Sequence, residues 1–258
     1  MCKVITVVNQ KGGVAKTTTA ANVGLGLAEL GKRVLFLDLD AQAHLSLSLG
    51  VELKEGEPSI YNLLFDESVK LESVVRKGVA ENVDLVPADI NLSAADLQLI
   101  NEMNRERLLA RRLSRWKDQY DFMIIDNSPS LSLLVINSLT AADYVLVPVQ
   151  CAFWALRGMK QLFDTIERVR TAELNPDLEV LGILLTMFDS RTSISQQVIE
   201  RLHESFGSKV FETKIKKTVQ FDYAAVAQKP ILLNAADSDA AAAYRAVAKE
   251  VLSRVEKA

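Results

Sequence analysis

Cysteine is scarce in this chain, and the two residues present, Cys2 and Cys151, lie far apart in the sequence. They cannot form a closely spaced metal-binding pair, and they provide no disulfide framework, which is typical of a reducing compartment. No apolar run approaches the roughly 20 residues that a membrane-spanning helix requires. The N-terminus shows no basic, apolar and cleavage regions in series. We therefore expect a cytoplasmic protein.

An excess of positive charge is also absent, since the formal net charge is −3 and the isoelectric point is about 5.6. Nucleic acid repels such a chain as a whole, so any contact with it must come from a local basic patch. Linkers rich in proline, glycine or serine, low-complexity tracts and internal repeats are missing as well. Hydrophobic residues make up 49% of the 258 positions, which is enough for a sizeable core.

What the chain does have is a regular alternation of strand and helix patterns. Short apolar runs rich in β-branched residues, as expected of strands buried on both faces of a parallel sheet, occur at 3–8, 33–37, 83–86, 122–125, 144–149 and 179–186. Helical patterns lie at 17–30, 91–102, 105–117, 131–141, 154–173, 193–206 and 238–256. The alternation predicts a doubly wound α/β fold with a mostly parallel sheet, and one domain over 1–258.

The first strand pattern is followed by the segment NQKGGVAKTTTAAN, residues 9–22. In doubly wound sheets ligands bind at the carboxyl ends of strands, where a glycine-rich turn lets backbone N–H groups converge on phosphate. Lys16 would place a positive charge on the β- and γ-phosphates, and the Thr17 hydroxyl suits Mg²⁺. The segment predicts a phosphate loop, whose nucleotide contacts we assign to Lys11, Gly12, Gly13, Val14, Ala15, Lys16, Thr17 and Thr18.

Acidic residues follow two further strand patterns. Asp38 and Asp40 come after the strand at 33–37, and two acids at a strand end can hold a metal-bound water or orient an attacking one. Acids also end strands without any catalytic role, so this pair alone decides little. Asp126 follows four apolar residues, the usual setting of the carboxylate that holds Mg²⁺ through water in a phosphate-loop enzyme. We assign the metal contacts to Thr17, Asp40 and Asp126.

Together these stretches resemble the ParA/Soj-type partition ATPases, which belong to the deviant Walker A class of the ParA/MinD superfamily. The motif of that class, Lys-Gly-Gly-x-x-Lys-Thr/Ser, is matched by Lys11, Gly12, Gly13, Lys16 and Thr17. Further similarity lies at 31–42, 124–143, 145–158 and 181–202, so the resemblance extends over almost the whole chain. The nitrogenase iron protein is a relative in this class, but its cluster ligands have no counterparts here.

The resemblance implies a P-loop ATPase that uses ATP and Mg²⁺, with Lys11, Lys16 and Asp40 as catalytic residues. In these ATPases the first lysine, here Lys11, reaches across a dimer interface to the partner's nucleotide, which couples ATP binding to homodimerisation. The ATP-bound dimer binds nucleoid DNA without sequence preference, and hydrolysis stimulated by a ParB-like partner releases it. The implied function is ATP-dependent partitioning or positioning of a cargo that the sequence does not identify.

Three departures from the family pattern bear on the hydrolysis rate. Ala15 stands where glycine is commoner, and if its φ is positive, alanine costs roughly 1 kcal/mol of strain. Pro-Gln-Gly-Asn after the second acid is replaced by Ala-Gln-Ala-His at 41–44, and Asp-x-Pro-Pro-Ser is Asp-Asn-Ser-Pro-Ser at 126–130. The alternative function is therefore a poorly hydrolysing nucleotide-binding regulator of the same fold, which acts through DNA or partner binding.

The DNA contacts that the resemblance implies fall in the C-terminal part of the chain. Arg191 matches one such position, whereas an arginine of many relatives is replaced by Gln220. We predict nonspecific DNA binding through Arg191, Lys214, Lys216 and Lys217. A second basic run, at 105–117, is either a DNA contact or a solvated helix face.

The last helical pattern bears on membrane attachment, for which MinD-type relatives use a C-terminal basic amphipathic helix. Here one stripe of the helix carries Tyr244, Val247, Val251 and Val255, and the end of the helix has few bulky apolar residues. That pattern favours packing on the domain over insertion into lipid, so we expect no membrane partner.

Overall fold

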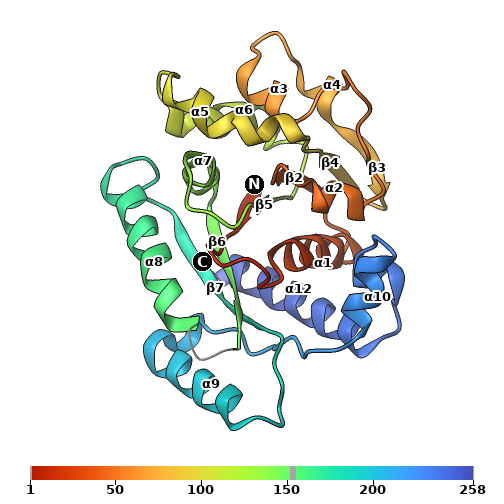
Figure 1. Ribbon diagram of the computed structural model, residues 1–258, viewed down its shortest axis with the longest axis vertical. Helices are drawn as coiled ribbons and strands as arrows, with labels where there is room; N and C mark the ends of the chain where they lie inside the picture. The colour runs from red at the N-terminus through yellow and green to blue at the C-terminus, as the bar shows by residue number, and fades with distance from the viewer. Residues whose placement is uncertain (1, 152–154, 258) are drawn as a thin grey trace.

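The computed structural model describes residues 2–151 and 155–257. A seven-stranded sheet forms its centre, in the strand order β3-β4-β2-β5-β1-β6-β7 (Figure 1). All neighbouring strands pair in parallel except β3, which pairs antiparallel with β4 at one edge. The strands are β1 (Lys3–Val7), β2 (Val34–Leu39), β3 (Arg76–Ala80), β4 (Val83–Val86), β5 (Phe122–Asn127), β6 (Tyr144–Gln150) and β7 (Glu179–Thr186).

The strands predicted from the sequence are confirmed, because each apolar run coincides with a strand that is almost entirely buried. β3 is the one described strand that the sequence pattern does not predict. Its residues are partly or fully exposed at the sheet edge, so it carries no apolar run.

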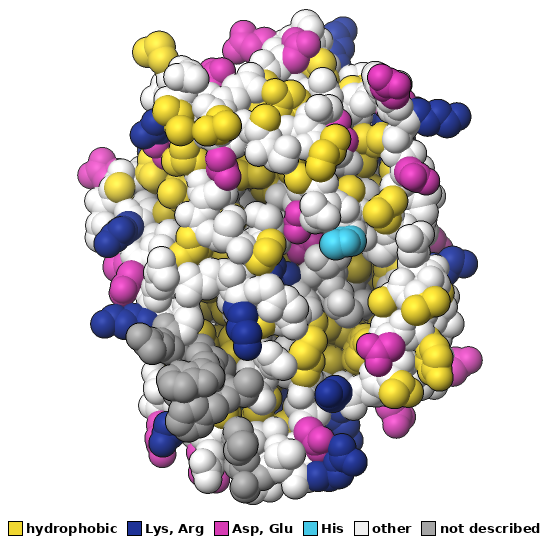
Figure 2. All heavy atoms as spheres, viewed as in Figure 1, with side chains coloured by type: hydrophobic (Ala, Val, Ile, Leu, Met, Phe, Trp, Pro, Cys, Tyr) yellow, Lys and Arg dark blue, Asp and Glu magenta, His cyan; other side chains and the backbone are white. Residues whose placement is uncertain are grey.

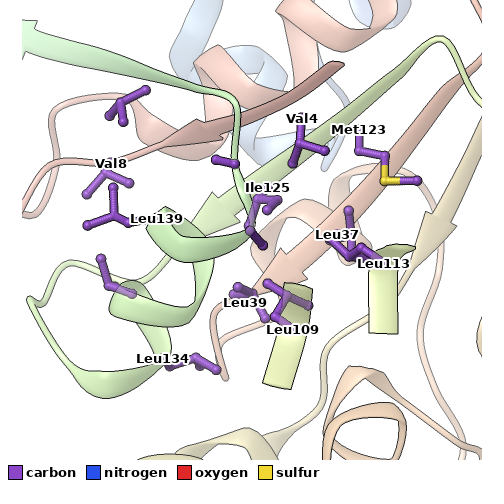
Figure 3. Packing of buried hydrophobic residues seen from close by; sticks show 14 of the residues in the cluster. Val4, Val8, Leu37, Leu39, Leu109, Leu113, Met123, Ile125, Leu134 and Leu139 are labelled. Atoms are coloured by element: carbon purple, nitrogen blue, oxygen red, sulfur yellow. The ribbon is translucent and has the colours of Figure 1, made fainter. Parts of the chain in front are cut away.

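Helices cover both faces of the sheet, which confirms the doubly wound architecture (Figure 1). On one face α1 (Lys16–Glu29) lies beside α12 (Asp239–Lys257), with the short helices α2 (His44–Ser48), α10 (Gln220–Val226) and α11 (Ile231–Asn234). The other face carries α3 (Ile60–Phe65), α4 (Leu71–Val74), α5 (Ala95–Ile100), α6 (Leu108–Leu113), α7 (Leu133–Ala141), α8 (Ala155–Thr171) and α9 (Ser193–Phe206). Figure 3 shows leucines of α6 and α7 packed against β1, β2 and β5.

Two predicted helices are shorter than the sequence pattern indicates. The pattern at 91–102 becomes a 3₁₀ turn, Ile90–Ala94, followed by α5, which ends at Ile100 before a turn that contains Asn104 with φ of 53°. The pattern at 105–117 becomes two 3₁₀ turns flanking α6. The helices predicted at 131–141, 193–206 and 238–256 are confirmed. α8 confirms the pattern at 154–173 from Ala155 onward, and residue 154 lies outside the described residues.

Side chains distant in sequence anchor α1, the helix that follows the phosphate loop. The buried Thr19 hydroxyl lies 3.3 Å from the Tyr244 hydroxyl of α12. The Asn22 Oδ1 accepts the Leu232 N–H at 3.0 Å, which ties α1 to α11. The predicted packing of the Tyr244 stripe on the domain is confirmed, because Tyr244, Val247 and Val251 are fully buried. Within the described part of the chain, no helix is both long and apolar enough to span a bilayer.

Candidate nucleotide-binding site

The loop between β1 and α1 is shaped to receive an anion. Gly13 and Ala15 both have left-handed backbones, with φ of 70° and 66°. Ala15 is the N-cap of α1 and offers no side-chain hydrogen bond, so the first N–H groups of the helix are left for a ligand. The loop is held from behind, where the Thr186 hydroxyl of β7 donates to the Val14 carbonyl at 3.1 Å.

Lys16 lies within this loop rather than on the protein surface. Its side chain is 7% exposed, and its Nζ donates to the Lys11 carbonyl at 3.1 Å. Burial lowers the pKa of Lys16, while the charges of Asp126 and Asp40 act in the opposite direction. A buried ammonium beside two carboxylates and an uncapped helix N-terminus is suited to bind a phosphate group.

The acids at the ends of β2 and β5 are direct neighbours. Asp38 and Asp126 are register partners, and both are fully buried. Neither carboxylate oxygen of Asp126 has a hydrogen-bond partner among the described residues. Burial has the largest effect on Asp126 and, together with the charge of Asp38, raises its pKa well above the usual value. The nearby Thr17 hydroxyl lowers this pKa in part, although it is not in hydrogen-bonding geometry with the carboxylate.

An unpartnered buried carboxylate is costly unless a cation or its water accompanies it. Asp126 therefore fits the Mg²⁺ contact that the sequence predicts, and Thr17 lies at its side. Within 2–151 and 155–257, no three or more His, Cys, Asp or Glu side chains are placed so that they could hold a metal ion together. A metal here would accordingly keep water and phosphate ligands, as Mg²⁺ does in phosphate-loop sites.

Asp38 and Asp40, which the sequence presents as a pair, have different surroundings. Asp38 accepts from the Ser46 hydroxyl at 2.7 Å and from its N–H at 2.9 Å, so it fixes α2 to the end of β2. Burial raises the pKa of Asp38 to about 6, and its bonds to Ser46 lower it in part. Asp40 is partly exposed and accepts the Gln42 N–H at 3.0 Å. Asp40 is therefore the more accessible acid of this pair.

The alanine departures fall at strained positions. Ala15 has φ of 66° and ψ of 37°, and Ala43, the N-cap of α2, has φ of 52° and ψ of 30°. Both therefore adopt the left-handed conformation that favours glycine. Alanine at position 15 is costly only if its φ is positive, and the structure shows that it is. Ala43, in the loop after Asp40, has a positive φ as well.

Beside the phosphate loop lies a cavity of about 520 Å³ that the sequence analysis does not identify. Gly13, Ala15 and Thr18 form its floor, and its walls come from the segments after β7, including Met187, Asp189, Thr218, Phe221 and Asp222. Its lining is mainly apolar, as suits a planar base. Its place at the carboxyl end of β7 is the signal that could have located it.

Three of the four predicted DNA contacts border the same cavity. Lys216, Lys217 and Arg191 all line it. The Lys217 N–H donates to the Phe188 carbonyl at 3.0 Å, and this bond holds the segment of the two lysines beside the segment that leads to Arg191. Arg191 is paired with Asp189, at 2.9 and 2.7 Å, so its charge is already largely compensated. Lys214 lies in an adjoining groove with Lys216 and Lys217. Figure 2 shows basic side chains gathered on this part of the surface, between α9 and α10.

The 105–117 run has a buried and an exposed side. Leu109, Leu113 and Trp116 are buried in the core, while Arg107, Arg111 and Arg115 recur every four residues on the exposed side. This segment lies on the α6 side of the sheet, away from Lys214 and Lys216. The geometry is that of an amphipathic helix whose arginines face solvent.

Comparisons with known proteins agree with this geometry. Residues 2–180 match the sequence model of a family described as an AAA domain. The chain is 43% identical to the sporulation initiation inhibitor protein Soj of Bacillus subtilis, over 97% of this chain and 98% of that protein. It is 41% identical to the chromosome partitioning protein ParA of Caulobacter vibrioides, over 98% of this chain and 94% of that protein.

Solved structures include one described as cobyrinic acid a,c-diamide synthase from Mycobacterium smegmatis with bound ADP and magnesium. The TM-score is 0.86 at 37% identity, covering 99% of this chain and 96% of that one. The matches to Soj and ParA cover nearly the full length of both proteins. They agree with the phosphate loop, the buried acid and the sheet order described above. The chain belongs to the ParA/Soj family of P-loop ATPases.

Proposed function

We propose that this chain binds Mg²⁺·ATP at the phosphate loop and hydrolyses it slowly to drive the partitioning or positioning of DNA or another large cargo. The observation that carries the proposal is the unpartnered buried carboxylate of Asp126 beside the buried ammonium of Lys16. A metal–phosphate group supplies what both lack, a cation for the acid and an anion for the lysine.

Each residue of the site has a distinct part in phosphoryl transfer. The N–H groups from Gly12 to Thr18 cradle the phosphates, and Lys16 stabilises the charge that develops on the γ-phosphoryl oxygens. Mg²⁺, when bound, neutralises the phosphates, and we assign its contacts to Thr17, Asp40 and Asp126. Asp40 is accessible enough to orient the attacking water. The base enters the adjoining 520 Å³ cavity.

The assembly that follows ATP binding is also part of the proposal. Lys11, exposed at the mouth of the loop, serves the nucleotide of a second subunit, so that ATP and dimerisation are coupled. The homodimer binds nucleoid DNA without sequence preference, and a ParB-like protein stimulates hydrolysis and release. We further propose that residues 1–258 form one domain, since β7 and α12 belong to the same sheet and core as β1 and α1.

Two substitutions test the roles of the lysines. Lys16→Ala should abolish ATP binding, because the loop loses its buried cation; titration calorimetry measures this. Lys11→Ala should bind ATP as a monomer but fail to dimerise, which light scattering with ATP detects. Micromolar ATP affinity in the first variant, or a normal dimer in the second, would contradict the respective assignment.

The water-orienting role of Asp40 has its own test. Asp40→Ala should accumulate an ATP-bound dimer that turns over far more slowly than the parent, with DNA binding retained. Parental turnover in this variant would make Asp40 a structural residue only.

The strained Ala15 and Ala43 favour a second candidate, the poorly hydrolysing regulator of the same fold. Steady-state turnover with and without DNA and a ParB-like protein separates the two functions, since only a cycling ATPase is stimulated.

The name of the Mycobacterium smegmatis structure suggests a third use of the same ATP site, amidation of a carboxylic acid. Turnover that depends on a carboxylic acid and an ammonia donor, and not on DNA, would favour that use.

A further inference from the structure

Three amide side chains fasten the first half of the phosphate loop to the end of β6 and the start of α8. Asn9, which is 6% exposed, donates from Nδ2 to the Pro148 carbonyl at 2.8 Å and accepts the Lys11 N–H at 2.9 Å. Gln10 donates from Nε2 to the Gly158 carbonyl at 2.8 Å. The backbone at Lys11 therefore has a fixed position relative to β6.

The third amide, Gln150, contacts the Lys11 side chain itself. The Lys11 Nζ donates to Gln150 Oε1 at 3.1 Å, although both the lysine and this contact are exposed to solvent. Gln150 is the last residue of β6 and is a register partner of Thr186, the residue that holds Val14. No ion pair in the described part of the chain involves Lys11.

We propose that Gln150 is a positioning residue that holds Lys11 on its own subunit in the nucleotide-free monomer, and that ATP-dependent dimerisation must break this contact. The inference rests on the proposed function for its second half, the transfer of the lysine to a partner's nucleotide. The first half, the hold within the monomer, stands on the geometry alone.

A neutral acceptor gives this hold a limited strength. A solvent-exposed hydrogen bond changes an equilibrium by about 2- to 10-fold, so the lysine is retained but remains releasable. Both subunits of a symmetric dimer give up the contact, so the effect on the dimerisation constant is about the square of that factor. A carboxylate in place of the amide would form an ion pair with Lys11 and hold it more tightly.

The hold in the monomer is tested by competitive acetylation of lysines in nucleotide-free protein, with the modification of Lys11 read by mass spectrometry. Gln150→Ala should raise the labelling rate of Lys11 relative to that of Lys257, by about 2- to 10-fold. Gln150→Glu should lower it, and salt should weaken that protection. Gln161→Glu, the same change at an exposed glutamine of α8, is the control and should leave the rate unchanged.

The consequence for assembly is tested by the protein concentration at which ATP produces half-maximal dimer in analytical ultracentrifugation. Gln150→Ala should lower this concentration, and Gln150→Glu should raise it, most strongly at low salt. Weaker dimerisation of Gln150→Ala would show that Gln150 presents the lysine to the partner. It would overturn the proposal that dimerisation must break the contact between Lys11 and Gln150. Unchanged labelling in both Gln150 variants would overturn the hold. A parent that never dimerises with ATP would reject the proposed function, while labelling still decides the hold.

Discussion

Ala15 and Ala43 hold the left-handed conformations that shape the two loops around the nucleotide site. Neither alanine is forced into this geometry by its own preference, since a Cβ in the left-handed region costs about 1 kcal/mol or more. Both residues are N-caps whose carbonyls accept the first helical bond: Thr19 N–H donates to the Ala15 carbonyl at 2.9 Å, and Leu47 N–H donates to the Ala43 carbonyl at 2.8 Å. The left-handed turns therefore lie directly at the starts of α1 and α2.

Replacing Ala15 with glycine should relieve this strain. We expect Ala15→Gly to raise the free energy of unfolding of the nucleotide-free protein by about 0.5–1 kcal/mol, after the larger backbone entropy of glycine in the unfolded chain is subtracted. Urea denaturation followed by circular dichroism measures the change. Ala225→Gly, in the helical and exposed part of α10, is the matched control and should lower stability by about 1 kcal/mol. Equal losses in the two variants would show that Ala15 is not strained.

At this scale the sequence predicts residues whose role depends on spacing within one segment. The loop spacing predicts that Lys16 and Thr17 open the helix after the loop, and the apolar run predicts that Asp126 lies at the end of a strand; the structure has both placements. The different roles of Asp38 and Asp40 could not be predicted, because they depend on Ser46 and on the register of β2 with β5. Gln150 is missed for the same reason, since its contact joins residues 139 positions apart.

Among the elements, the helices α1 and α12 pack closely against each other beneath the site. A Cβ on Gly26 would lie 2.7 Å from the Ala248 Cβ, closer than real contacts allow. Arg245 of α12 also binds Glu29 at the end of α1, at 2.6 and 2.9 Å. The position of the phosphate loop therefore depends on α12, which is more than 200 residues away in the sequence.

A methyl group in this seam should force the helices apart. We expect Gly26→Ala to lower the free energy of unfolding by about 1–2 kcal/mol, as overpacking outweighs the gain in helix propensity. Ala248→Gly should restore the missing space, so the double variant should be more stable than the sum of the two single changes predicts. Chemical denaturation of all four proteins measures this coupling. Additive effects would mean that the two helices do not meet at these residues.

The elements that the sequence predicts best are those with a strong local pattern. Strands buried on both faces show continuous apolar runs, and long amphipathic helices such as α9 and α12 show clear periodicity. The short helices α2, α3, α10 and α11 are not predicted, since they are only four to seven residues long. Tertiary contacts and caps hold them instead, as the Ser59 capping box does for α3.

Over the whole molecule, the distribution of charge matters more than its total. The net charge of −3 opposes DNA binding, so a patch must provide the attraction. Lys214, Lys216 and Lys217 share one groove. Lys216 and Lys217 also border the 520 Å³ cavity beside the phosphate loop, and Arg191 is paired with Asp189. Lys214 is therefore the predicted DNA contact that can be changed with least effect on ATP.

We expect Lys214→Glu to weaken binding of the ATP-bound protein to DNA of any sequence and to reduce the slope of log affinity against log salt by about one per lost phosphate contact. ATP affinity and dimerisation should stay at the parental level, because Lys214 does not line the nucleotide cavity. Fluorescence anisotropy at several salt concentrations measures the slope. Lys257→Glu, the same change near the N-terminal end of β7, is the control, because Lys214 lies by the C-terminal end of that strand; it should leave the slope unchanged.

The outcome also decides between the two basic surfaces. If Lys214→Glu binds DNA as the parent does while a variant carrying Arg111→Glu and Arg115→Glu does not, the contact lies on the α6 side of the sheet. Equal weakening by Lys214→Glu and Lys257→Glu would indicate a general effect of net charge, with no defined patch. Absence of DNA binding by the parent dimer at low salt would reject the nucleoid as its partner, because electrostatic attraction is strongest there.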